Sequence, residues 1–185
     1  MLAALKAAET TMLVLVVGPS GAGKDTLLNA AKDALRDDPR VHFVRRVITR
    51  PADPHGENHE PVTEAEFAAR DFALSWSAHG LRYGISAVDT APVVVANVSR
   101  GVIAAAAAQY AVRVIEVTAS PEILAARLVA RGRETAAEVA RRLDRAALIP
   151  PGVAVETVWN DATLAIGMER FVATLRHVVD AALRP

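Results

Sequence analysis

A glycine-rich loop near the start of the chain has the composition of a phosphate-binding site. It occupies residues 18–24, reads Gly-Pro-Ser-Gly-Ala-Gly-Lys, and follows the apolar run Met12–Val17. Glycines let several backbone N–H groups approach phosphate oxygens, and a helix that starts at the end of the loop adds its positive pole. We expect the loop to bind the phosphates of ATP, and the alternative is a glycine turn without a ligand. The predicted contacts are Gly18, Pro19, Ser20, Gly21, Ala22, Gly23 and Lys24.

The residues at the end of this loop are candidates for phosphoryl transfer and for magnesium binding. Lys24 supplies a mobile charge that can follow the β- and γ-phosphates, and a hydroxyl shortly after such a lysine usually binds Mg²⁺. Here Asp25 occupies the usual position of that hydroxyl and Thr26 follows it. We therefore expect Thr26 to bind magnesium. Asp25 is either a first-turn charge favoured by the helix dipole or a group close to the magnesium ion.

The elements that must position these residues alternate between strand and helix along the chain. Short apolar runs rich in valine predict buried parallel strands, and helical spacing of apolar residues follows the loop. Such an order predicts an α/β P-loop fold with a central parallel sheet flanked by helices. The predicted strands are Met12–Val17 and residues 41–48, 92–97, 112–117 and 153–159; the predicted helices are residues 25–36, 101–110, 121–130, a helix from Thr135, and residues 164–183.

Two stretches interrupt this alternation and predict segments that cover a site. Residues 49–59 are too polar for a core and combine proline, glycine, histidine and acidic residues. Residues 127–145 are rich in arginine, including Arg127, Arg131 and Arg142. These arginines either grip phosphates or form a solvated helix face, which is the usual role of such runs.

Composition limits the classes of function that the chain can have. Its 185 residues, 52% of them hydrophobic, fit one globular domain over residues 1–185. A net charge of zero provides no overall field for nucleic acid or a membrane surface, so we expect neither as a partner. The absence of cysteine is compatible with a cytoplasmic protein. The sequence favours no particular oligomeric state.

The chain resembles the guanylate kinase branch of the nucleoside monophosphate kinases over nearly its whole length. The loop 18–24 matches that branch letter for letter, and Ile-Thr-Arg at 48–50 and Arg-Tyr-Gly at 82–84 resemble its acceptor segments. The resemblance implies that Arg50 and Tyr83 hold an acceptor phosphate. It further implies a lid over residues 127–145 in which Arg131 and Arg142 grip the transferring phosphates, with Arg127 also on the nucleotide. The segment Trp-Asn-Asp at 159–161 resembles the part near adenine, which implies a nucleotide contact by Asn160.

The acceptor half differs from guanylate kinases. Ser75 stands where they carry the glutamate that pairs with guanine, and His59 replaces a phosphate-binding tyrosine. The strings Gly-Glu-Asn-His at 56–59, Leu-Ser-Trp at 74–76 and Gly-Lys-Asp at 23–25 instead resemble the ribose 1,5-bisphosphate phosphokinases. That resemblance implies ATP and Mg²⁺ as cofactors and ribose 1,5-bisphosphate as the small-molecule acceptor, with 5-phosphoribosyl 1-diphosphate and ADP as products. The implied acceptor-binding region spans residues 49–86, with contacts from Arg50, Glu57, Asn58, His59, Trp76 and Tyr83.

Other functions stay open at this point. A guanylate kinase or another nucleoside monophosphate kinase would use the same loop. A catalytically inactive guanylate-kinase-like binding module is disfavoured, because such modules can lose the loop lysine and Lys24 is present. Trp76 is either a core residue or a ligand platform, and His59 is either part of the loop structure or a substrate contact.

Overall fold

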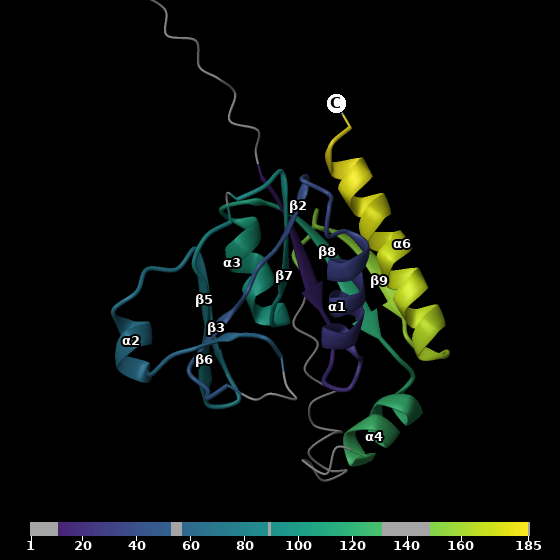
Figure 1. Ribbon diagram of the computed structural model, residues 1–185, viewed down its shortest axis with the longest axis horizontal. Helices are drawn as coiled ribbons and strands as arrows, with labels where there is room; N and C mark the ends of the chain where they lie inside the picture. The colour runs from purple at the N-terminus through teal and green to yellow at the C-terminus, as the bar shows by residue number, and fades with distance from the viewer. Residues whose placement is uncertain (1–10, 53–56, 89, 131–148, 185) are drawn as a thin grey trace, which may run out of the picture.

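The computed structural model describes residues 11–52, 57–88, 90–130 and 149–184. Its central sheet is five-stranded and parallel, in the order β2-β7-β1-β8-β9 (Figure 1). The strands are β1 (Met12–Val17), β2 (Val41–Phe43), β7 (Val93–Asn97), β8 (Ala111–Thr118) and β9 (Ala154–Trp159). Residues 13–17 of β1 are fully buried, as expected for the middle strand of a parallel sheet that is covered on both faces.

Alternate residues of β1 point into two separate cores. Val14 and Val16 pack with apolar residues of α1 (Lys24–Ala34) and α6 (Leu164–Ala182), and these two helices lie side by side on one face of the sheet (Figure 1). Leu13 and Leu15 pack on the other face with residues of η1 (Arg100–Val102) and α3 (Ile103–Ala107). The helix α4 (Pro121–Ala130) follows the carboxyl end of β8. The predicted central parallel sheet with flanking helices is therefore confirmed.

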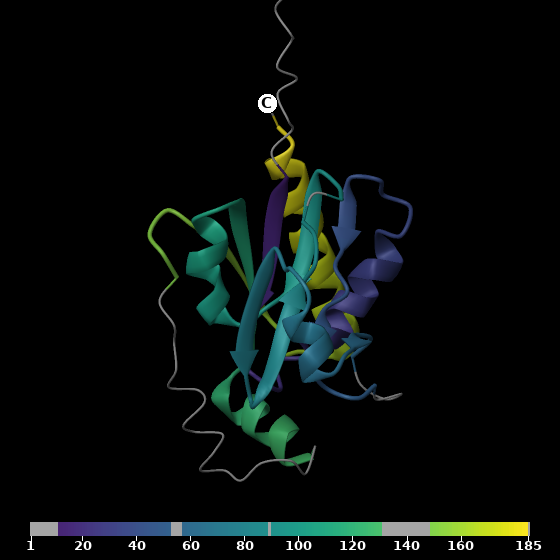
Figure 2. The ribbon, with the colours of Figure 1, turned by 90° about the vertical axis from the view of Figure 1, so that its left-hand side faces the viewer.

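A second, smaller sheet lies beside the first and has the strand order β4-β3-β6-β5. Figure 2 views the molecule from the side of this sheet. Its strands are β3 (Val47–Ile48), β4 (Glu60–Pro61), β5 (Leu74–Ala78) and β6 (Leu81–Ile85), and the short helix α2 (Glu64–Ala68) lies between β4 and β5 in the chain. Leu74 and Ile85 face the core that contains Leu13 and Leu15. The two sheets therefore share one apolar core.

The prediction of a single strand over residues 41–48 is wrong. The chain leaves the central sheet after β2, where the Val44 amide still donates to the Val95 carbonyl oxygen over 2.9 Å, and enters the second sheet only at β3. Arg45 and Arg46 separate the two apolar pieces. Because guanidinium groups cannot be left in the apolar core, the chain bends at these residues. Arg45 is exposed and donates to the His59 carbonyl oxygen, and Arg46 donates to Glu57.

The other predicted elements agree with the structure within a few residues. The predicted helix 101–110 is divided into η1 and α3, and the helices predicted at 25–36, 121–130 and 164–183 correspond to α1, α4 and α6. The helix predicted from Thr135 lies outside the described residues. Within the described ranges, no helix is long and apolar enough to cross a membrane.

Candidate functional site

The glycine loop connects the end of β1 to the start of α1, and close contacts require its glycines. A Cβ atom added to Gly18 would lie 1.9 Å from the carbonyl oxygen of Val117 on β8, so no side chain fits there. Gly21 and Gly23 have φ angles of 86° and 89°, in the left-handed region that favours glycine. These conformations turn successive backbone N–H groups toward the same side, which is the arrangement that binds phosphate oxygens.

The positive end of α1 is available to an anion. Gly23 is the N-cap residue and provides no side-chain hydrogen bond to the first turn, so the first N–H groups of α1 have no side-chain acceptor there. Lys24 bends back over the loop, where its Nζ donates to the carbonyl oxygens of Gly18 at 2.7 Å and Pro19 at 3.0 Å. The ammonium group is thereby held at the loop, beside the position that a bound phosphate chain would occupy.

Asn160, predicted to lie near adenine, is buried behind the loop. Its Nδ2 donates to the Ala22 carbonyl oxygen at 2.8 Å, and its backbone N–H donates to the Thr118 carbonyl oxygen at 2.8 Å. A Cβ atom at Gly23 would lie 2.7 Å from Nδ2, and one at Gly167 of α6 would lie 2.2 Å from Oδ1. The amide therefore fills a narrow space between the loop and α6, and these contacts support the loop conformation.

Arg127 also supports the loop. It comes from α4, and its Nη2 donates to the Asn160 carbonyl oxygen at 2.8 Å while Nη1 lies 3.4 Å from the Gly21 carbonyl oxygen. The structure thus places Arg127 against the phosphate loop, and its contact with the nucleotide stays a prediction. Arg131 and Arg142, and most of the predicted lid 127–145, lie outside the described residues.

The positions of Thr26 and Asp25 are compatible with the predicted binding of a magnesium ion. Thr26 is exposed in the first turn of α1. The neighbouring carboxylate of Asp25 accepts a hydrogen bond of 2.9 Å from Nδ2 of Asn97, at the carboxyl end of β7. No group of three or more histidine or carboxylate residues that could hold a metal occurs in the described part of the chain. Mg²⁺ at kinase sites usually takes one or two protein oxygens together with water and phosphate oxygens, and Thr26 with Asp25 fits that pattern.

In the predicted acceptor region, His59 links two loop segments. It is 3% exposed, its Nδ1 lies 2.9 Å from the Glu57 carbonyl oxygen, and its Nε2 lies 3.0 Å from the Arg50 carbonyl oxygen. Nη2 of Arg50 lies 3.5 Å from the same Nδ1. The Nε of Arg50 is buried and has no hydrogen-bond partner among the described residues. A buried donor without an acceptor is costly, so this guanidinium is suited to an anionic ligand.

Tyr83 and Trp76 lie opposite each other on the paired strands β6 and β5, and Trp76 packs partly against the core that contains Leu13 and Leu15. Their rings stack with centroids 5.3 Å apart and an interplanar angle of 8°. The guanidinium carbon of Arg46 lies 5.4 Å from the centre of the Tyr83 ring, and Nε of Arg46 donates to Oε1 of Glu57 at 2.6 Å. Nη2 of Arg46 donates to the other carboxylate oxygen. Glu57 thus binds Arg46 in a bidentate ion pair, and Arg46 was not among the predicted site residues.

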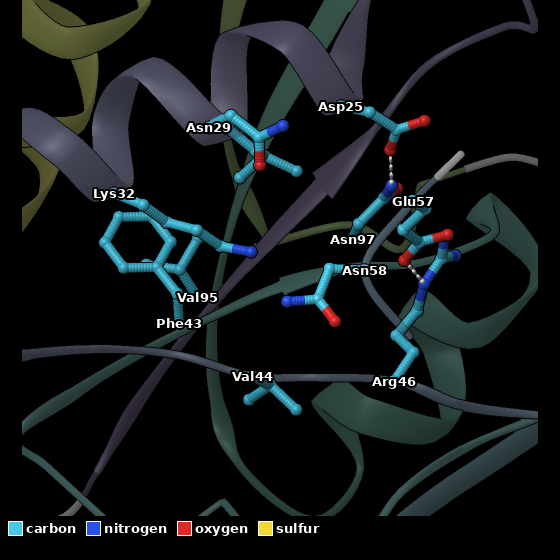
Figure 3. A pocket seen from close by; sticks show the side chains of 11 residues that line it. Asp25, Asn29, Lys32, Phe43, Val44, Arg46, Glu57, Asn58, Val95 and Asn97 are labelled. Carbon is cyan, nitrogen blue, oxygen red and sulfur yellow. Dashed lines mark hydrogen bonds and ion pairs between the residues drawn. The ribbon is translucent and has the colours of Figure 1, made fainter. Parts of the chain in front are cut away.

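A polar pocket separates α1 from the acceptor region (Figure 3). Its α1 side carries residues that the sequence interpretation did not assign to substrate, Asn29 and Lys32, and Asn97 closes it at the end of β7. The spacing of Asp25, Asn29 and Lys32 could have predicted that they share a site, because residues four and three apart lie on one face of a helix. The pocket is lined by Asp25, Leu28, Asn29, Lys32, Phe43, Val44, Arg46, Glu57, Asn58, Val95 and Asn97.

Comparison with known proteins identifies relatives over the whole of this arrangement. The family model described as an AAA domain matches residues 13–148. Ribose 1,5-bisphosphate phosphokinase PhnN of Acidiphilium cryptum is 51% identical over 178 residues, which cover 94% of this chain and 97% of that protein. The protein of the same name from Pseudofrankia inefficax is 47% identical over 182 residues, covering 93% of both proteins. A guanylate kinase from Anaplasma phagocytophilum has the same fold, with a TM-score of 0.64 at 15% identity over 91% of this chain and 86% of that one.

Proposed function

The chain belongs to the family of ribose 1,5-bisphosphate phosphokinases, and from that premise we propose that it transfers the γ-phosphoryl group of ATP to the 1-phosphate of ribose 1,5-bisphosphate. The products are 5-phosphoribosyl 1-diphosphate and ADP. The observation that carries the proposal is the 51% identity over 94% of the chain to a protein of that name, together with a phosphate loop that faces a basic acceptor region. Since the reaction uses ATP, we place it in the cytoplasm.

The proposed reaction needs positioning more than proton transfer. The bond between the γ-phosphorus and the oxygen bridging to ADP breaks, and a bond forms from the γ-phosphorus to an oxygen of the 1-phosphate. That oxygen is already ionised near neutral pH, so no general base has to remove a proton. Two polyanions must nevertheless be brought in line, and the rate therefore depends on charge neutralisation and geometry.

On the donor side, the loop 18–24 binds the β- and γ-phosphates through its backbone N–H groups, and Lys24 follows the charge that moves between them. Thr26 is the magnesium ligand in this proposal, with Asp25 beside it. Mg²⁺, when bound, neutralises the phosphate oxygens around the transferred group. Arg131 and Arg142 of the proposed lid, residues 127–145, would grip the same phosphates when the lid closes.

On the acceptor side, residues 49–86 supply the binding groups. Arg50 has a buried Nε without a partner in the described structure, which favours its proposed role on the acceptor 1-phosphate. Tyr83 and Trp76 stack on each other in this region, and the His59 ring joins the backbone of Arg50 to that of Glu57. Ser75 is exposed on β5 and has no carboxylate to pair with guanine, which disfavours GMP as the acceptor.

The experiment that tests this function identifies the product. Purified protein with ATP, Mg²⁺ and ribose 1,5-bisphosphate should release ADP, and ³¹P NMR should show the coupled signals of a new diphosphate as the 1-phosphate signal disappears. ADP release without a diphosphate attached to the sugar would show hydrolysis of ATP and contradict the proposal.

A further inference from the structure

The pocket between α1 and the acceptor region has a polar lining that the roles above do not use. On α1, Asn29 and Lys32 continue the face that begins with Asp25, while Leu27 and Ala31 of the same helix are buried in the core. Asn58 and Arg46 line the opposite side. Figure 3 shows these side chains directed toward a common space.

Lys32 is the residue in this pocket whose environment best fits a bound ligand. It is half-buried, and within the described residues its ammonium group makes no hydrogen bond or ion pair. A lysine in the last turn of a helix is favoured by the dipole, but that effect does not require the side chain to point into a pocket. In Figure 3 the ammonium group points to the middle of the pocket, toward Asn58. An anion placed there would stabilise this ammonium group through its opposite charge.

Arg46 provides the second cation, and its position is fixed. Glu57 accepts hydrogen bonds from Nε and Nη2, and the Tyr83 ring lies under the guanidinium plane. Nη1 is not used by the Glu57 pair, so the guanidinium retains donors for a further acceptor. A preorganised arginine beside a half-buried lysine is a suitable site for a phosphate group.

The position of Lys32 along α1 fits an acceptor with two phosphates. Asp25 lies next to the loop lysine, and Lys32 lies seven residues further along α1, a rise of about 10 Å. An acceptor whose 1-phosphate meets the nucleotide at the loop would therefore extend along α1 toward Lys32. The pocket lies at the carboxyl ends of β2 and β7, where open α/β sheets bind ligands.

We propose that Lys32 and Arg46 form a subsite for the phosphate group that is not phosphorylated, the 5-phosphate of the acceptor. Asn29 and Asn58 lie beside it with amide groups that suit the sugar hydroxyls. The subsite selects acceptors that carry a second phosphate and places the 1-phosphate at the loop. This inference rests on the proposed function for the identity of the acceptor, but the subsite can be tested by binding alone.

The test compares acceptors with and without the 5-phosphate. In the wild type, kcat/KM should be much higher for ribose 1,5-bisphosphate than for ribose 1-phosphate. Lys32→Met should lower this ratio by about 10- to 100-fold, because a charge-assisted hydrogen bond to the 5-phosphate is lost. Lys32→Arg keeps the positive charge, so its ratio should lie between those of Lys32→Met and the wild type. Arg36→Met is the matched control and should leave the ratio unchanged, because Arg36 is an exposed arginine just beyond the end of α1 and pairs with Asp33.

Binding of ribose 5-phosphate, measured by calorimetry without ATP, separates the subsite from the overall reaction. The inference predicts that Lys32→Met weakens this binding and Arg36→Met does not. An unchanged acceptor ratio in Lys32→Met, with ribose 1,5-bisphosphate still converted, would overturn the subsite and leave the proposed function standing. Lys32-dependent binding of ribose 5-phosphate by a protein that does not convert ribose 1,5-bisphosphate would support the subsite and overturn the function. Failure of both assays in the wild type would overturn both.

Discussion

At the scale of single residues, Lys24 and Asn160 both contact the phosphate loop but have different proposed roles. Lys24 holds its ammonium group over the loop, 2.7 Å from the carbonyl oxygen of Gly18, where it can transfer its contacts to phosphate oxygens. Asn160 reaches the same loop from behind and is 4% exposed. The first residue acts on the charge of the nucleotide, and the second maintains the backbone shape that receives it.

Lys24→Met should remove most phosphoryl transfer while leaving the fold intact, because the charge that follows the β- and γ-phosphates is lost and the apolar stem is kept. We expect kcat to fall by at least about a hundredfold, as for the loss of one transition-state contact. Steady-state ADP release measures the effect, and an unchanged circular dichroism spectrum is the control. A folded variant with normal kcat would contradict the proposed role of the loop in phosphoryl transfer.

Asn160→Ala should lower the free energy of unfolding by about 1–3 kcal/mol, because the buried carbonyl oxygen of Ala22 loses its donor and a space opens behind the loop. The KM for ATP should rise as the loop loosens. Urea unfolding and ATP kinetics measure the two effects. If the variant instead kept wild-type stability and changed only the preference between ATP and GTP, Asn160 would be an adenine contact, as its sequence context predicts.

The sequence predicts the donor residues better than the acceptor residues, for a physical reason. Loop glycines and their lysine are consecutive in the chain, and their geometry is local. Arg46, Lys32 and Asn97 come together only through the packing of α1, β7 and the segment after β2. Helix spacing does place Asp25, Asn29 and Lys32 on one face, but the sequence does not show that Arg46 lies opposite them.

At the scale of elements, the bend after β2 separates the two sheets and creates the acceptor region. The sequence predicts one strand over residues 41–48 because apolar residues lie on both sides of Arg45 and Arg46. The sequence interpretation also did not predict the β5–β6 hairpin, although the glycine in its two-residue turn is typical of hairpins. His79 and Gly80 have φ angles of 53° and 73°, as a two-residue hairpin turn with left-handed residues requires. Two-residue strands such as β3 are too short for any periodicity to reveal.

A charged cluster connects the turn before β2 with the end of α6. Arg40 donates to Asp38, and its Nη1 also donates to Asp180 at 3.0 Å. Hydrogen bonds from the Arg40 side chain hold the pKa of Asp38 below its ordinary value. A lowered pKa in the folded state means that the stabilisation is fully present above the unfolded pKa of about 3.9 and is lost as the pH falls through the folded value.

Asp38→Asn should therefore lower the free energy of unfolding by less than about 1 kcal/mol near neutral pH, the range of surface ion pairs. The difference from wild type should shrink below about pH 4, where the wild-type carboxyl also becomes protonated. Urea unfolding over a series of pH values measures it, with Asp33→Asn, an aspartate in an exposed i,i+3 pair, as the comparison. A difference that grows toward acid pH would contradict this assignment.

At the scale of the whole molecule, the residues proposed to bind the two substrates gather at one edge of the parallel sheet. The carboxyl ends of β1 and β7 carry the phosphate loop and Asn97, and Arg46, next to β3 of the second sheet, lines the pocket opposite α1. The α/β P-loop kinase fold could be predicted from the alternation of elements and is confirmed by the guanylate kinase likeness. In our proposal the choice of acceptor depends on Ser75 and on the polar pocket along α1, not on the fold.

The most direct measurement of the central claim is the ratio of kcat/KM for ribose 1,5-bisphosphate to that for GMP, with ATP and Mg²⁺ in both assays. Ser75 offers no carboxylate for guanine, while Arg50 suits the 1-phosphate and Lys32 with Arg46 suits a second phosphate. We expect ribose 1,5-bisphosphate to be used at least about a hundredfold more efficiently, which corresponds to about 2.7 kcal/mol of transition-state discrimination. A preference for GMP would contradict the account and make this protein a guanylate kinase.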